Sequence, residues 1–183
     1  MADKDAISQN VATLSRVMAW LSTAGFLIVP ALVIYAFLEP ENSKWLMFDM
    51  DHLGATLNSA VPLQFRLIAL ACALVPVGFT MWALWSLRRL FLLYASGEIF
   101  SPGALSALNH VAMALFGGVV AGFIAEAPIS VALTWTLGHG HRELSLGFGT
   151  GDASSLFMAG VVLVIARVMA EARRVADENA KFV

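Results

Sequence analysis

The stretch VAMALFGGVVAGFIAEAPISVALTWTL, residues 111–137, decides the fold class of this chain. It carries one charged residue, Glu126, in a run longer than the ~20 apolar residues that cross a bilayer as a helix. Segments of other runs in the chain, such as LIALACALVPVGF and AGVVLVIA, are apolar on every face, whereas a strand of a membrane barrel alternates apolar and polar residues. The stretch therefore predicts a transmembrane helix.

Three further apolar runs lie at residues 17–38, 65–87 and 153–166, and the last extends to residue 170 if Arg167 reaches the membrane surface. The whole chain is 59% hydrophobic and 13% charged, whereas soluble domains carry about 25% charged residues. We therefore predict an all-α, polytopic membrane protein in which residues 1–183 form a single domain of four transmembrane helices.

Basic residues are divided unevenly between the two ends of these helices. Eight flank one end, and only Lys44, Arg66 and Arg142 lie in the connections at the other end. The eight are Lys4, Arg16, Arg88, Arg89, Arg167, Arg173, Arg174 and Lys181. The positive-inside rule then places both termini in the cytoplasm. The basic residues are too scattered for nucleic-acid binding, and we expect Arg88 and Arg89 to contact anionic lipid headgroups.

The connections differ in character. Residues 41–62, an outer connection, include the apolar string KWLMFDMDHLGATL, which favours a short helix lying on the membrane surface. Residues 138–152 form a glycine-rich outer loop that ends at Asp152, the predicted N-cap of the last helix. Residues 171–183 predict an amphipathic cytoplasmic tail, with i,i+4 ion pairs Arg173–Asp177 and Arg174–Glu178.

The second helix is expected to be longer than the membrane is thick. It begins after Pro62, and its pattern continues to Gly97, a predicted C′ residue. That length is about 34 residues, or ~51 Å, against a hydrocarbon core of ~30 Å. Ser101 and Pro102 then predict the N-cap and first position of the next helix. A long cytoplasmic hairpin between helices two and three follows.

The hairpin segment LRRLFLLYASGEIFSPGALSALNHVAMAL carries Tyr94, Gly97 and Phe100, and the chain ends in ARVMAEARRVADENAKFV. Both strings resemble an uncharacterised bacterial membrane family, domain of unknown function 2975, over most of the chain from Pro62 onward. The resemblance implies a four-span architecture and a place in the bacterial inner (cytoplasmic) membrane. It implies no catalytic residue.

Glu126 lies on a helix face of small residues. In steps of four residues, this face carries Ala114, Gly118, Gly122, Glu126 and Ser130. Small residues allow helices in lipid to approach closely. We therefore predict a helix-packing face formed by Ala114, Gly118, Gly122 and Glu126. Three roles remain open for the carboxyl group: a residue that fixes packing, a proton, cation or ligand site, and a contact with another subunit.

Arg66 is the best partner for Glu126 within the chain. Both are expected in the outer half of neighbouring antiparallel helices, at depths that differ by ~10 Å. Pro128 lacks a backbone N–H, so the carbonyl of Ile124 loses its helical donor and makes this region polar. An intramembrane ion pair or proton site at Glu126 and Arg66 follows as a hypothesis.

A metal site on the outer face is a weaker hypothesis. His139, His141 and Glu143 lie in one outer loop, and His52 lies in the other beside two aspartates. Imidazole and carboxylate groups bind zinc or copper, but HxH in a glycine-rich loop is more typical of solvated residues. The single cysteine, Cys72, excludes an intramolecular disulfide and a cysteine metal cluster. No cofactor is predicted.

The sequence contains no phosphate-binding glycine loop, no GxSxG elbow and no carboxylate dyad within the membrane. We therefore expect a noncatalytic protein that acts through helix contacts as an accessory, assembly or regulatory partner of another membrane component. Its expected partners are the lipid bilayer and either a second copy or another integral membrane protein. The alternatives are a small proton- or ion-coupled transporter or sensor that uses Glu126, and an outer-face metal binder.

Overall fold

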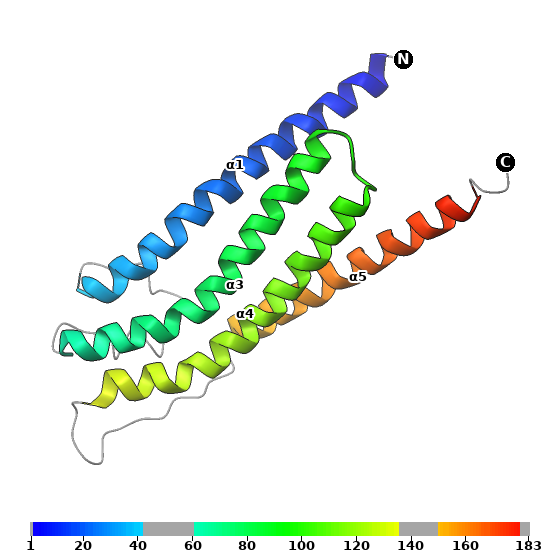
Figure 1. Ribbon diagram of the computed structural model, residues 1–183. Coiled ribbons are helices and arrows are strands. Elements are labelled where there is room, and N and C mark those ends of the chain that lie inside the picture. Colours follow the sequence, from blue (N-terminus) through cyan, green and yellow to red (C-terminus); the bar gives the residue numbers. More distant parts are fainter. Residues whose placement is uncertain (1, 42–60, 136–149, 180–183) are drawn as a thin grey trace. The chain divides into compact units, whose positions relative to one another are not determined.

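The computed structural model of the chain describes residues 2–41, 61–135 and 150–179. They form the helices α1 (Ala2–Leu38), α3 (Leu63–Ala95), α4 (Pro102–Thr134) and α5 (Thr150–Asn179) (Figure 1). Each helix contains a segment long and apolar enough to cross a membrane. The prediction of an all-helical chain with four candidate spans is therefore confirmed.

The turn between α3 and α4 is fixed by local chemistry. Gly97 has a positive φ of 83°. Its N–H donates to the Tyr94 carbonyl at 3.1 Å, and the Glu98 N–H donates to the Leu93 carbonyl at 2.9 Å. These two bonds form a Schellman motif with glycine at C′. The Ser101 hydroxyl then accepts from the Ala104 N–H at 3.1 Å, so the predicted caps of this hairpin are confirmed.

Two helix starts differ from expectation. α1 begins at Ala2, well before the apolar run at residue 17, because residues 2–16 contain neither proline nor glycine, the two residue types that break a helix most strongly. α5 begins at Thr150, so Asp152 lies inside the helix and the prediction that it is the N-cap was wrong. The glycine-rich sequence before this helix does not indicate whether it begins at Thr150 or after Asp152.

The chain divides into two compact units, which are described separately. Unit 1 consists of Met1–Phe26, Thr80–Phe116 and Leu156–Val183. Its core is a small cluster in which Leu90 of α3 packs against Ala104 and Ala107 of α4. The Arg173 guanidinium of α5 donates to the Phe100 carbonyl in the turn, so the end of α5 is bound to the hairpin.

Unit 2 consists of Leu27–Phe79 and Gly117–Ser155. Its core is larger and joins three helices: Phe37, Val61, Ala69, Leu70, Ala125, Ile129, Ala132 and Leu133. α3 and α4 also meet where the ring of Phe79 covers Gly117. A Cβ atom added at Gly117 would lie 2.5 Å from that ring, so the close approach requires glycine at this position.

Large apolar side chains cover much of the outer surface. Trp20 is 77% exposed, Phe157 72% and Leu27 67%. A soluble protein does not leave an apolar surface of this extent in water. Lipid tails or apolar partner helices are the environment that fits it, which agrees with the four candidate spans.

Candidate functional site

Glu126 lies on α4 in unit 2 and is half-buried. The next residue toward the N-terminus, Ala125, belongs to the core of that unit. Close by, the Ser130 hydroxyl donates to the Ala127 carbonyl at 2.9 Å, and Thr134 donates to the Ser130 carbonyl at 2.8 Å. These hydroxyls therefore satisfy backbone acceptors of their own helix next to Pro128.

The register of α3 against α4 gives the depth of Arg66 relative to Glu126. Phe79 faces Gly117. In an antiparallel pair, a step of nine residues toward the N-terminus of α3 leads to Leu70, and a step of nine residues toward the C-terminus of α4 leads to Glu126. Leu70 and Glu126 therefore lie at the same level of the pair. Leu70 and Ala125 share one core cluster, which agrees with this register. Arg66 lies four residues beyond Leu70, or about 6 Å along the helix. An arginine side chain is long enough to cover that separation.

The Arg66 guanidinium already has one backbone partner. Its Nη1 donates to the carbonyl of Leu38, the last residue of α1, at 2.9 Å. Its Nε is buried and has no hydrogen-bond partner among the described residues. The structure therefore ties Arg66 to the end of α1 and brings it to within about one helical turn of Glu126 in register. The ion pair between them stays a prediction.

The small-residue face of α4 is used unevenly within the chain. Ala114 is buried, and a Cβ atom on Gly118 would meet Phe79 at 3.6 Å, an ordinary contact distance. A Cβ atom on Gly122 would meet none of the described residues within 4 Å. The tightest contact belongs instead to Gly117, which the i+4 pattern did not select. The sign of this contact in the sequence was the adjacent pair Gly117 and Gly118.

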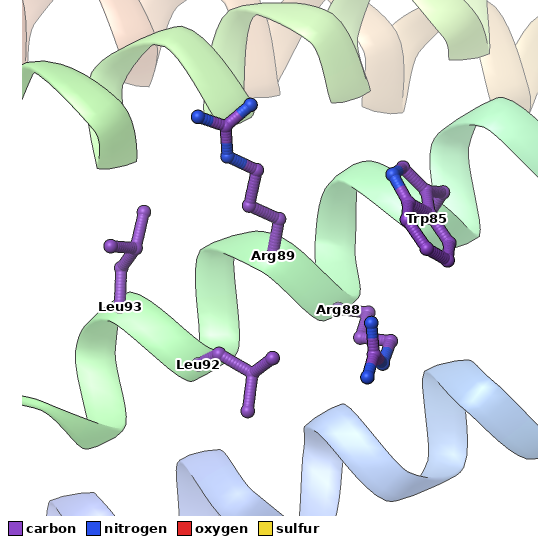
Figure 2. Close-up of a pocket in the computed structure, with 5 residues that line it drawn as sticks. All are labelled: Trp85, Arg88, Arg89, Leu92 and Leu93. Atoms are coloured by element: carbon purple, nitrogen blue, oxygen red, sulfur yellow. The ribbon is translucent and has the colours of Figure 1, made fainter.

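A second polar feature lies in unit 1, where Arg88 and Arg89 follow Trp85 on α3. The Arg88 guanidinium lies 5.3 Å from the centre of the Trp85 ring, within the range of a cation–π contact. In Figure 2, Arg88 and Leu92 point to one side of α3, and Arg89 and Leu93 point to the other. The two guanidinium groups therefore point in different directions, although both residues line one recess.

Two recesses adjoin Arg88. One has a volume of about 260 Å³ and is lined by Trp85, Arg88, Arg89, Leu92 and Leu93. The other has a volume of about 220 Å³ and is lined by Ser22, Thr23, Phe26, Leu84, Trp85 and Arg88. Trp85 and Arg88 belong to both linings. The arginines are visible in the sequence but the recesses are not, since the second recess depends on how α1 packs beside α3.

The residues of the metal hypothesis, His52, His139, His141 and Glu143, lie outside the described residues. The same holds for most of the connection 41–62 and of the glycine-rich loop 138–152. In the tail, the predicted pair of Arg174 with Glu178 is confirmed at 3.1 Å. Arg174 also pairs with Glu171 at 2.5 Å.

Comparison with known proteins identifies a family. The model of a family described as a protein of unknown function, DUF2975, matches residues 45–183. No curated protein and no solved structure matches the chain. The matched residues include α3, α4, α5 and the capped turn. The chain therefore belongs to this family.

Proposed function

We propose that the chain is a noncatalytic integral membrane protein that acts through helix contacts, as an accessory, assembly or regulatory partner of another membrane component. One observation carries the proposal. Gly117 and Gly118 are in contact with Phe79, whereas one turn further along α4 the space beside Gly122 is open. A glycine with no neighbour among the described residues of its own chain lets a second helix approach α4 closely.

The proposed setting is the bacterial inner membrane, with both termini in the cytoplasm. The distribution of basic residues supports this orientation, since eight lie at one end of the helices and three at the other. The capped turn between α3 and α4 then faces the cytoplasm together with the basic end of α5. A partner that crosses the membrane beside α4 would also be able to reach this turn.

Association in membranes tests the proposal. In vesicles that hold donor- and acceptor-labelled chains, the native protein should show energy transfer with itself or with a copurified membrane protein. Gly122→Leu should weaken that association about fivefold or more, because the larger side chain fills the space of the approaching helix. Gly78→Leu is the matched control, because Gly78 on α3 also has nothing within 4 Å among the described residues, but its neighbours one turn away are Leu74 and Trp82, so it belongs to no small-residue face.

Two outcomes would contradict the proposal. One is a chain that stays monomeric and copurifies with no other membrane protein. The other is an association that Gly122→Leu and Gly78→Leu weaken equally, because a general effect of bulk would then explain the loss. Unchanged thermal unfolding of both variants keeps a folding defect apart from a loss of contact.

A proton- or ion-coupled transporter or sensor is the second candidate. It is favoured by the buried, unsatisfied Nε of Arg66 about one turn in register from Glu126, since ionisable groups inside a membrane commonly lie on ion or proton pathways. In vesicles with an internal pH indicator, the native chain should conduct protons. Glu126→Gln should abolish the flux, and Glu98→Gln in the exposed turn should keep it.

The outer-face metal binder is the third candidate. Metal content after purification and its loss in a His139→Ala, His141→Ala double variant test it directly. A metal-free native protein that takes up neither zinc nor copper would exclude it.

A further inference from the structure

The two recesses beside Arg88 have the features of a lipid site. We propose that Arg88 binds the phosphate of an anionic phospholipid, with Trp85 beside the headgroup and an acyl chain along the apolar wall between α1 and α3. This inference concerns unit 1 alone. It does not depend on the proposed contact at Gly122.

Arg88 and Arg89 are the basic residues among the described lining of the two recesses. Neither Arg88 nor Arg89 has an ion pair or hydrogen bond within the described part of the chain, and the one recorded contact of Arg88 is with the Trp85 ring. No acidic residue appears among the lining residues described for the two recesses. A half-buried guanidinium without a carboxylate partner attracts an anion, and arginine binds phosphate through two parallel N–H groups.

The other polar groups in the walls are already occupied. Ser22 donates its hydroxyl proton to the Met18 carbonyl at 2.9 Å, and Thr23 donates to the Ala19 carbonyl at 2.8 Å. The rest of that wall is apolar and consists of Phe26, Leu84 and the Trp85 ring. One cation beside an apolar wall suits an amphiphile better than a free inorganic anion, which needs several polar donors around it.

The position of Arg88 along α3 also fits a headgroup. The residues between Arg66 and Arg88, numbers 67–87, are uncharged, and as helix they extend for about 32 Å. A hydrocarbon core is ~30 Å thick, so an arginine at the end of this run lies near the headgroups. Trp85 comes one turn earlier and is 55% exposed, and tryptophan is enriched at this level of the membrane.

Arg89 has a smaller expected role. Both arginines line the first recess, but in Figure 2 the Arg89 side chain points away from the Arg88 side chain, and the second recess is lined by Arg88 without Arg89. Arg89 still adds positive charge at the same level of the helix. We therefore expect Arg88 to account for most of the lipid selectivity and Arg89 for a minor part.

Lipid titration of the purified full chain in mild detergent, followed by native mass spectrometry, tests the proposal. The probes are phosphatidylglycerol and phosphatidylcholine with the same acyl chains. The native chain should bind phosphatidylglycerol at least about fivefold more tightly, and Arg88→Gln should remove most of that preference. Arg88→Lys should keep part of it. Arg167→Gln is the matched control, since Arg167 is an exposed arginine of the same unit that lines neither recess.

A competition with inorganic phosphate at constant ionic strength separates lipid from free anion. Bound phosphatidylglycerol should remain when inorganic phosphate is added. Three results would overturn the proposal: no preference for the anionic lipid, equal losses in Arg88→Gln and Arg167→Gln, or complete displacement by inorganic phosphate. Helical circular dichroism of each variant verifies that the chain stays folded.

Discussion

Arg66 and Arg88 lie on the same helix, yet their surroundings differ. Arg66, in unit 2, donates to the Leu38 carbonyl and buries its Nε beside a core that joins three helices. Arg88, in unit 1, lies against one aromatic ring and borders two recesses. The same side chain therefore serves packing in one unit and is available to a ligand in the other. Packing around the residue, more than its type, determines its role.

The largest expected effect concerns the close packing of unit 2. Gly117→Leu places a large side chain where a Cβ atom alone would lie 2.5 Å from Phe79. We expect a loss of about 3 kcal/mol in the free energy of unfolding, the upper part of the range for an overpacked core. Thermal unfolding in detergent measures it. Gly78→Leu should change stability little, and equal losses in both variants would show that the Phe79 contact is not the cause.

The next effect compares the two arginines directly. Arg66→Gln removes the hydrogen bond that the charged guanidinium donates to the Leu38 carbonyl, at a cost of about 2 kcal/mol. Arg88→Gln should cost less than about 0.5 kcal/mol, because it breaks no hydrogen bond described within the chain. Denaturant unfolding of both variants decides the point. A larger loss of unfolding free energy for Arg88→Gln than for Arg66→Gln would contradict the roles given to the two arginines.

A double-mutant cycle sharpens the role of Arg66. If Arg66 also pairs with Glu126, the variants Arg66→Gln and Glu126→Gln should be coupled by about 1 kcal/mol. The four unfolding free energies of the cycle give this coupling energy. A coupling energy within error of zero would show that Arg66 and Glu126 do not pair, and it would leave the Leu38 carbonyl as the main partner of Arg66.

These comparisons also separate what the sequence can predict from what it cannot. The caps at Gly97 and Ser101 were predictable, because each depends on a few neighbouring residues. The four spans were predictable from run length alone. The contact of Phe79 with Gly117 was not, since any of several residues on α3 was able to face that pair of glycines.

The candidate sites show the same limit. The charges of Glu126, Arg66 and Arg88 within or beside apolar runs are visible in the sequence. Their surroundings depend on tertiary packing, because α1 supplies both the Leu38 carbonyl beside Arg66 and the wall beside Arg88. That wall is formed by Ser22, Thr23 and Phe26. The helical start of α1 at Ala2 was also missed, because apolar periodicity does not mark a polar helix.

The smallest expected effects concern the tail of α5. Arg173 donates to the Phe100 carbonyl in the turn, so Arg173→Gln should cost about 1 kcal/mol and speed amide exchange near residue 100. Arg174 pairs only with exposed Glu171 and Glu178, so Arg174→Gln should cost less than about 0.5 kcal/mol and be sensitive to salt. Hydrogen exchange of the two variants compares them. Equal exchange near residue 100 would contradict the role of Arg173.

Site-directed crosslinking tests the central claim, that α4 meets another helix at Gly122, most directly. The native cysteine is first removed by Cys72→Ser, and Gly122→Cys or Gly78→Cys is then introduced as a single reactive thiol. Under mild oxidation or with a short thiol-reactive crosslinker in native membranes, the account predicts a specific crosslinked product for Gly122→Cys and little for Gly78→Cys. No product at Gly122, or equal products at the two positions, would contradict it.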